Sequence, residues 1–188
     1  MIRLTIDGKL IEVEKGTTIL NAAEQAGIEI PTLCYIKDLL PDGSCRMCMV
    51  EIENNGRSKM DTSCTAQVSE GMVVSTKSEK VVKSRRNVLD MLLSNHKTDC
   101  FSCPSNGGCK LQDLCYEYGV ERTSFEGERI DLPIDDTNYF FTYNPNLCIL
   151  CHRCVNTCHK IVGRGAIDTM QRGFSSVIGT PFNEDWKD

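Results

Sequence analysis

Apolar and polar positions alternate along residues 1–77 in the way that β-strands require. Successive side chains of a strand face opposite sides, so alternation places the apolar ones on a single buried face. The dipeptides Asp7-Gly8 and Asn55-Gly56 supply tight turns between such runs. The strands that this pattern predicts cover residues 2–6, 10–13, 49–53 and 72–76. We therefore expect a small β-rich domain over residues 1–77.

One short helix is expected within this domain, ending at Ala26. Thr17 or Thr18 can cap its first turn, because a threonine hydroxyl accepts a hydrogen bond from an unpaired backbone N–H group. Gly27 follows Ala26, at the position where helices commonly end in a left-handed residue. Pro31 then opens a loop that carries the first cysteines.

From Ser78 onward the spacing of apolar residues becomes helical. The apolar stripe consists of Val81, Val82, Val88, Leu89, Leu92 and Leu93. A second short helix carries Leu111, Leu114, Cys115 and Tyr118 and stops at Gly119. The two helices predict a small helical domain over residues 78–120, which Ser78 begins as a cap.

The rest of the chain divides into a connection and a compact segment. Residues 121–137 are polar and acidic and include Pro133, which predicts a surface linker. Residues 138–188 form the compact segment, with a hairpin expected around Arg172-Gly173. The chain is therefore expected to be an α+β protein of three small parts and one linker.

Twelve cysteines among 188 residues change this picture. The first residues lack the apolar core of a signal peptide, and no apolar run approaches the ~18 residues of a membrane span. We therefore expect a cytoplasmic protein, in which clustered cysteines more often bind metal than form disulfides. A net charge of −5 argues against a nucleic-acid partner, and an aromatic content of 6% favours small metal-stapled units over one large core.

The first cysteine set has the spacing C-x10-C-x2-C-x15-C. Its members are Cys34, Cys45, Cys48 and Cys64. The C-x2-C pair places two thiolates on one tight loop, where both reach one iron, and the other two complete a second iron. Four thiolates satisfy a 2Fe–2S cluster. A structural zinc site is the alternative, since four cysteines also suit zinc.

The second set has the spacing H-x3-C-x2-C-x5-C. Its members are His96, Cys100, Cys103 and Cys109. One imidazole and three thiolates suit either a 4Fe–4S cluster or zinc, and the spacing leaves both open. Cys115 lies on the apolar face of the following helix, so we interpret it as core packing rather than as a ligand.

The third set, with the spacing C-x2-C-x2-C-x3-C, is the most specific signal in the chain. Its members are Cys148, Cys151, Cys154 and Cys158. The run matches bacterial ferredoxins, in which three cysteines serve one 4Fe–4S cluster and the fourth serves a neighbouring cluster. His159 stands where ferredoxins usually have proline, and no second run of this kind occurs. The fourth ligand of a third cluster therefore stays open between Cys158, a partner's residue and an open site.

The order of the three sets resembles the N-terminal iron–sulfur region shared by FeFe hydrogenases and the large peripheral iron–sulfur subunit of respiratory complex I. The diaphorase iron–sulfur subunits of NAD-linked hydrogenases look similar. The segments that carry the resemblance are Gly43–Glu51, Cys64-Thr65, Gly71–Val74, His96–Cys109, Leu111–Leu114 and Cys148–Cys154. Together they extend over nearly the full length of the chain.

This resemblance implies three cluster-binding parts. They are a β-grasp 2Fe–2S ferredoxin domain, a domain with one 4Fe–4S cluster held by one histidine and three cysteines, and a ferredoxin-like segment with a second 4Fe–4S cluster. The last is half of the usual two-cluster unit. The resemblance favours iron over zinc at the second set.

The resemblance also implies a role and partners. The role is an electron relay between an FMN-bearing, NAD(P)H-oxidising flavoprotein and another redox partner in a multisubunit oxidoreductase. A thioredoxin-like 2Fe–2S subunit and a ferredoxin, hydrogenase or other catalytic subunit are further expected partners. The sequence leaves open the direction of electron flow and whether a partner flavoprotein bifurcates electrons.

The same residues leave two alternatives to the relay. In one, the chain is the front part of an FeFe hydrogenase whose catalytic domain lies beyond Asp188. In the other, it is a zinc-stapled interaction module. No glycine-rich dinucleotide loop, acid–base pair or nucleophile motif stands out in the sequence, so no catalytic site of its own is expected.

Overall fold

The computed structural model describes residues 1–54 and 56–187, which form two compact units. The first unit consists of Met1–Leu89 and Gly107–Glu121. The second consists of Asp90–Asn106 and the described residues from Arg122 onward. Both helices and strands occur, so the expected α+β class is confirmed.

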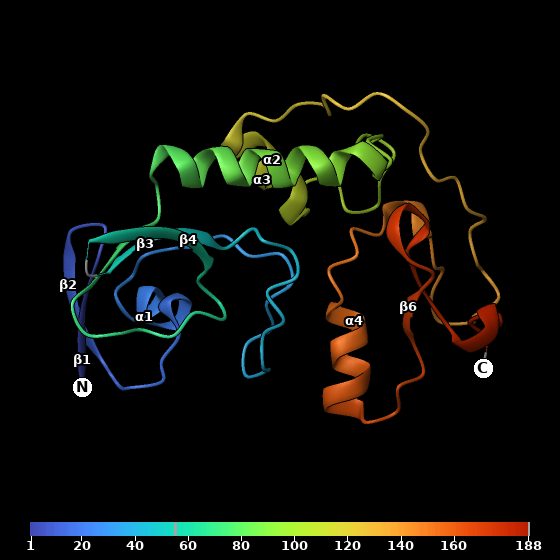
Figure 1. Ribbon diagram of the computed structural model, residues 1–188. Helices are drawn as coiled ribbons and strands as arrows, with labels where there is room; N and C mark the ends of the chain where they lie inside the picture. The colour runs from blue at the N-terminus through green and yellow to red at the C-terminus, as the bar shows by residue number, and fades with distance from the viewer. Residues whose placement is uncertain (55, 188) are drawn as a thin grey trace. The chain divides into compact units, whose positions relative to one another are not determined.

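A five-stranded mixed sheet is the framework of the first unit (Figure 1). Its strands are β1 (Ile2–Ile6), β2 (Lys9–Val13), β3 (Met49–Asn54), β4 (Arg57–Thr62) and β5 (Met72–Ser75). They lie in the order β2-β1-β5-β3-β4, with β1 and β5 parallel and the other pairs antiparallel. All four strands expected from the alternating pattern are present. The turn expected at Asn55-Gly56 includes Asn55, which lies outside the described residues.

Helix α1 (Ile19–Gln25) packs on this sheet and completes its core. Thr18 is the N-cap, and its Oγ1 accepts a hydrogen bond from the Asn21 N–H at 3.3 Å. Gly27 has a φ of +71°, the left-handed conformation expected after the helix. The buried core joins strand residues to helix residues, among them Leu4, Ile6, Val50, Ile52, Val74, Ile19, Leu20, Ala22 and Ala23.

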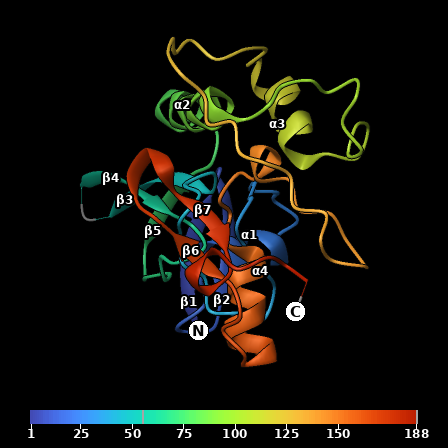
Figure 2. The same cartoon turned by 90° about the vertical axis from the view of Figure 1, so that its right-hand side faces the viewer.

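Two helices follow the sheet, as the change of period predicts. They are α2 (Glu79–Asn95) and α3 (Lys110–Tyr118), and α3 ends at Gly119 with a φ of +65°. Within the first unit, Arg86 of α2 donates through Nε to the Tyr118 carbonyl of α3 at 2.8 Å, and Figure 2 shows the two helices side by side. Cys115 is buried on α3, as expected for a packing residue.

The second unit contains little regular structure. A hairpin of β6 (Asp168–Met170) and β7 (Val177–Gly179) is antiparallel and confirms the turn expected around Arg172-Gly173. The short helices are η1 (Pro145–Leu147), α4 (Arg153–Asn156), η2 (Thr157–Val162), η3 (Gly173–Ser175) and η4 (Pro181–Asn183). In the described part of the chain, no helix has the length and apolar character needed to cross a membrane.

Residues 122–137 are mostly exposed, yet side chains of their own unit hold them in place. The Asp90 carboxylate accepts hydrogen bonds from Thr123 and Ser124, including the Ser124 N–H at 2.8 Å. Asn146 both donates to and accepts from the Leu132 backbone, at 2.8 and 2.9 Å. The polar connection is therefore fixed at several points along its length.

Candidate metal centres

The first cysteine set lies on loops at one end of the sheet. Cys48 immediately precedes β3, and Cys64 follows β4 by two residues. The Cys48 Sγ lies 3.3 Å from the Cys64 Sγ, and the Cys34 and Cys45 thiols form a second hydrogen-bonded pair. Cys34, Cys45 and Cys48 all act electrostatically on Cys64. The structure thus brings together all four sulfurs that the spacing singled out.

A hydrogen bond joins the two thiols of each pair and shifts their pKa values in opposite directions. The hydrogen bond from Cys45 lowers the pKa of Cys34 to about 5, and the same contact raises the pKa of Cys45. Cys64 lowers the pKa of Cys48 to about 6, and the pKa of Cys64 rises in turn. The pairing therefore favours a thiolate at Cys34 and at Cys48, the form in which cysteine binds metal.

Backbone geometry directs N–H groups toward this site. Arg46 has a φ of +58°, a left-handed conformation that bends the loop between Cys45 and Cys48. The Met47 N–H then donates to the Cys45 Sγ at 3.5 Å. The buried Ser63 hydroxyl has no partner of ordinary hydrogen-bond geometry, and it helps to lower the pKa of Cys48. Such donors stabilise negative sulfur, so the surroundings fit an iron–sulfur group.

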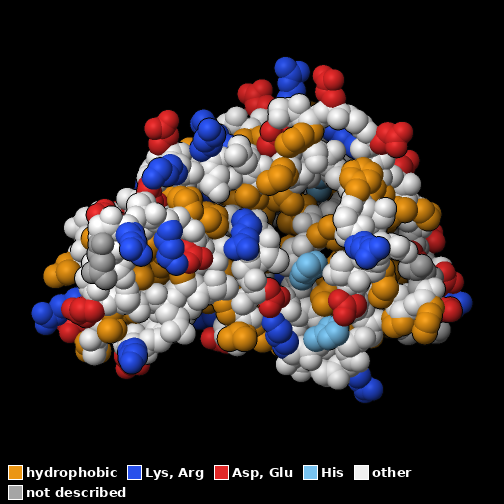
Figure 3. All heavy atoms as spheres, viewed as in Figure 1, with side chains coloured by type: hydrophobic (Ala, Val, Ile, Leu, Met, Phe, Trp, Pro, Cys, Tyr) orange, Lys and Arg blue, Asp and Glu red, His pale blue; other side chains and the backbone are white. Residues whose placement is uncertain are grey.

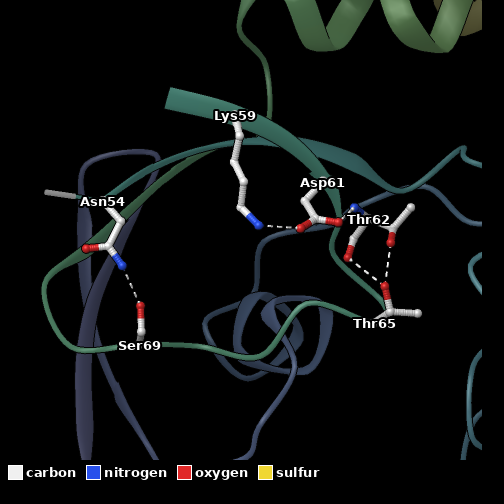
Figure 4. A network of polar contacts seen from close by, with 6 residues as sticks. All are labelled: Asn54, Lys59, Asp61, Thr62, Thr65 and Ser69. Carbon is white, nitrogen blue, oxygen red and sulfur yellow. Dashed lines mark hydrogen bonds and ion pairs between the residues drawn. The ribbon is translucent and has the colours of Figure 1, made fainter. Parts of the chain in front are cut away.

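A polar network fixes the turn that carries Cys64 (Figure 4). Asp61 accepts hydrogen bonds from the Lys59 ammonium at 2.7 Å and from the Thr62 N–H at 2.8 Å. The Thr62 and Thr65 hydroxyls are 2.5 Å apart. Because Thr62 and Thr65 flank Cys64, these bonds hold the direction of its side chain.

Gly43 packs against the same turn. It has a φ of +64°, and a Cβ at this position would lie 3.2 Å from Thr65 Cγ2 and 3.4 Å from Thr62 Oγ1. Both the backbone conformation and the lack of space therefore require glycine.

The second set is divided between the two units. His96, Cys100 and Cys103 belong to the second unit, and Cys109 belongs to the first as the N-cap residue of α3. The His96 Nδ1 is buried and has no hydrogen-bond partner. Burial lowers the pKa of His96, which favours the neutral imidazole that binds metal. An unpaired, neutral ring nitrogen fits a ligand role.

The third set lies on a loop in which left-handed residues occur between the cysteines. Leu150 and His152 have φ values of +52° and +57°. The Leu150 N–H donates to the Cys148 Sγ at 3.4 Å. Burial is the main cause that raises the pKa of Cys148, and the charges of Cys151 and Cys154 add to it. Three of the four predicted sulfurs therefore lie close enough to influence one another electrostatically.

Cys158 has a different environment. It lies in η2, a π-helical turn, and its Sγ accepts a hydrogen bond from the Ala166 N–H at 3.2 Å. Its charge contributes to raising the pKa of Cys154, after burial. His159, at the usual proline position, places its Nε2 3.0 Å from the Ile167 carbonyl, so it supports the chain that leads into β6.

Sequence reasoning missed Tyr143 at this site. Its hydroxyl donates to the Ile178 carbonyl at 2.7 Å and also lies beside Cys148. Burial raises the pKa of this phenol, with Cys148 and Cys154 contributing. Its place in the aromatic run five residues before Cys148 is the only signal that the sequence offers.

No group of three or more His, Cys, Asp and Glu side chains within residues 1–54 and 56–187 is arranged to hold a single metal ion. The candidate donors of the three sets are thiols and one imidazole. These are the ligand types of iron–sulfur clusters, in which each protein ligand binds one iron and inorganic sulfides bridge the irons.

Two protein families match consecutive parts of the chain. Residues 1–79 match the 2Fe-2S iron-sulfur cluster binding domain. Residues 85–124 match the NADH-ubiquinone oxidoreductase-G iron-sulfur binding region. The matches include every member of the first two sets.

Whole-chain comparisons agree with these families. The chain is 42% identical over 186 residues to NADPH-Fe(3+) oxidoreductase subunit alpha of Geobacter sulfurreducens, covering 96% of this chain and 21% of that protein. It is 39% identical over 181 residues to the mitochondrial NADH-ubiquinone oxidoreductase 78 kDa subunit of Neurospora crassa, covering 95% and 24%. The chain thus spans less than a quarter of the length of these relatives.

A solved structure is similar over a larger share of its length. A chain in the crystal structure of an NAD+-reducing [NiFe]-hydrogenase in the H2-reduced state superposes with a TM-score of 0.87 at 34% identity. The match covers 96% of this chain and 75% of that one.

Proposed function

The chain belongs to the family of iron–sulfur subunits found in complex I, NAD(P)H-linked oxidoreductases and NAD-reducing hydrogenases, and on this premise we propose which residues hold its clusters and what it connects. It is an iron–sulfur electron-transfer protein. We propose that it relays electrons between a flavin-bearing, NAD(P)H-oxidising partner and a second redox partner within a multisubunit oxidoreductase. The relatives' names, which combine nicotinamide nucleotides with iron, ubiquinone or hydrogenase activity, support this placement.

The gathering of four sulfurs as two hydrogen-bonded pairs is the observation that carries the proposal. The first site, a 2Fe–2S cluster in a domain of residues 1–77, takes Cys34, Cys45, Cys48 and Cys64 as ligands. The mixed sheet with α1 across one face supports the β-grasp assignment of this domain.

Two 4Fe–4S sites complete the relay. The ligands of the second, in a domain of residues 78–120, are His96, Cys100, Cys103 and Cys109. The third site, in the segment 138–188 beyond the 121–137 linker, uses Cys148, Cys151 and Cys154. Cys158 is the proposed fourth ligand. The electrostatic effects of Cys151 and Cys154 on Cys148 support the site, and the separate hydrogen bond to Cys158 makes the fourth ligand the part to test.

Bound clusters supply one-electron redox chemistry. The chain's own groups set the conditions for it. The Met47 and Leu150 N–H groups donate hydrogen bonds to proposed ligand sulfurs. These hydrogen bonds stabilise the negative charge on the sulfurs. Cys34, Cys48 and Cys64 are buried, which shields the first site from water.

The proposed partners follow from the same premise. They are an FMN-bearing flavoprotein, a thioredoxin-like 2Fe–2S subunit, and a ferredoxin, hydrogenase or other catalytic subunit. Lys and Arg side chains lie among Asp and Glu side chains on the face shown in Figure 3, a mixed surface that suits a protein partner.

Metal analysis of the chain tests the cluster assignment directly. Iron and acid-labile sulfide are measured after anaerobic purification, with electron paramagnetic resonance to separate cluster types. Full occupancy gives about 10 irons per chain, and an empty third site gives about 6. Zinc without iron would overturn the proposal.

A pair of cysteine variants tests the ligands of the first site. Cys48→Ser removes a proposed ligand, and we expect the 2Fe–2S signal to be lost while the 4Fe–4S signals remain. Cys115→Ser alters a buried cysteine outside the three sets and should retain every cluster. Equal cluster contents in the two variants would contradict the ligand assignment.

A further inference from the structure

Arg85 is a buried cation within the apolar face of α2. It is 2% exposed and lies one turn from both Val81 and Leu89, which are buried. Its Nη1 donates to the Tyr118 hydroxyl at 2.7 Å, and its Nη2 donates to the Met49 carbonyl at 3.0 Å. Its Nε is buried without a partner. The guanidinium is therefore held by two neutral oxygens from two different elements.

No carboxylate neutralises this charge within the part of the chain that the structure describes. The ion pairs there involve other cations, and Arg85 is in none of them. Burial raises the pKa of Tyr118, so the phenol stays neutral despite its contact with Arg85. The exposed Glu117 side chain also hydrogen-bonds this phenol, but among the described residues Glu117 forms no ion pair with Arg85. A buried charge without a counter-ion is costly, which calls for an anionic group nearby that stabilises it.

The group that Arg85 reaches is the peptide that follows Cys48. Met49 is the next residue after this proposed ligand, and its carbonyl accepts the Nη2 hydrogen bond. Cys48 and Arg85 are both buried, so water screens their charges poorly.

We propose that Arg85 raises the reduction potential of the first cluster site, an inference that rests on the 2Fe–2S assignment made above. When one electron arrives from a reduced partner, the site gains one negative charge and no bond forms or breaks. The fixed positive charge, held on the carbonyl of the residue after Cys48, stabilises this reduced state more than the oxidised one. Arg85 touches no sulfur, so it acts through its field and through the Met49 peptide.

The test is a redox titration of the iron-loaded chain, followed by the resonance signal of the 2Fe–2S cluster. Arg85→Gln keeps an N–H donor but removes the charge, and its midpoint should fall below that of the parent chain. Arg85→Lys keeps the charge and should retain most of the parent value. Arg86→Gln is the matched control, because Arg86 is the exposed neighbour on α2 and should leave the midpoint unchanged.

The dependence of the midpoint on ionic strength distinguishes the effect of a buried charge from that of a surface charge. The midpoint difference between Arg85→Gln and the parent chain should persist from low to high ionic strength, because buried charges are poorly screened. An unchanged midpoint in Arg85→Gln, or an equal fall in Arg86→Gln, would overturn the inference. If Arg85→Gln fails to take up its cluster, Arg85→Lys decides: a marked fall despite the retained charge counts against the proposal.

The iron content of the parent chain shows whether a negative result contradicts the proposed function or only the role of Arg85. A parent chain without a 2Fe–2S signal would defeat the cluster assignment itself. A loaded parent chain whose midpoint is insensitive to Arg85 would defeat only the role of Arg85.

Discussion

Gly43 lies against the turn that carries Cys64, in a left-handed conformation with no room for a side chain. We expect Gly43→Ala to lose stability and 2Fe–2S content together. Gly71→Ala is the control, since Gly71 has a similar φ of +71° but open space around it. The control should lose only the cost of the backbone conformation, about 1–2 kcal/mol. Anaerobic thermal unfolding and iron analysis of both variants measure this, and equal losses would argue against tight packing at Gly43.

His96 is the one proposed ligand that carries no negative charge when bound. His96→Cys replaces a neutral imidazole by a thiolate and makes the second site more negative by one charge. We therefore expect the midpoint of that cluster to fall. His159→Gln changes a histidine outside the proposed ligands and should leave this midpoint in place. A redox titration that finds no shift, or an upward one, in His96→Cys would exclude His96 as a ligand.

At the scale of elements, the sequence offered Thr17 and Thr18 as alternative N-caps for α1. The structure selects Thr18, whose hydroxyl accepts the Asn21 N–H. Thr18→Ala should therefore destabilise the protein by about 1 kcal/mol, within the range for lost N-caps. Thr17→Ala removes a hydroxyl that does not cap α1 and should have a much smaller effect. Denaturant unfolding of both variants checks this, and the reverse order would contradict the assigned cap.

The sequence predicted most of the helices and strands because their signals are local, although it did not predict β4 (Arg57–Thr62). Periods of two and of 3.6 residues, with glycines after helices, locate β1, β5, α1 and α3. The role of Arg85 was missed, although an arginine one turn from Val81 and Leu89 interrupts an apolar stripe. Its partners, Met49 and Tyr118, are more than 30 residues away, and no local pattern identifies them.

The same reason explains the connection at residues 121–137. Its polar composition predicts an exposed linker, and most of its side chains are exposed. The hydrogen bonds that fix it come from Asp90 and Asn146, which lie far from it in sequence or beyond its end. The composition of the segment therefore predicts that it is exposed. It does not predict the hydrogen bonds that hold the segment in place, because their partners come close only on folding.

The cysteine sets show how far spacing alone can lead. For the first set, spacing and structure agree, because two tight loops suffice to gather the sulfurs. For the third, the run identifies Cys148, Cys151 and Cys154, but not the Tyr143 hydroxyl beside them. Tyr143 is placed by its bond to Ile178 on β7, a contact that arises only on folding.

On the scale of the whole molecule, the two units differ in what stabilises them. The first has the extended core between the sheet and α1. Among the described residues of the second, Leu93 and Ile178 are the buried apolar side chains. So few buried groups cannot stabilise a unit of this size without help from bound metal.

Removal of iron should therefore affect the units unequally. We expect amides of the second unit to lose protection from hydrogen exchange when the clusters are extracted with a chelator. Amides of β1, β3 and β5 should stay better protected, because the apolar core between the sheet and α1 remains when the cluster beside it is removed. Mass spectrometry of loaded and cluster-free protein measures both, and a uniform loss of protection across the chain would contradict this division.

The 3.3 Å approach of the Cys48 and Cys64 sulfurs also makes the pair vulnerable to oxidation before a cluster is assembled. The contact with Cys64 lowers the pKa of Cys48 and so favours its thiolate, and a two-electron oxidant can then join the two sulfurs as a disulfide with release of the Cys64 proton. That bond would occupy two sulfurs that the cluster needs. Oxidation and cluster assembly thus compete for the same two sulfurs. The cluster must therefore be assembled before the newly synthesised chain is exposed to oxygen.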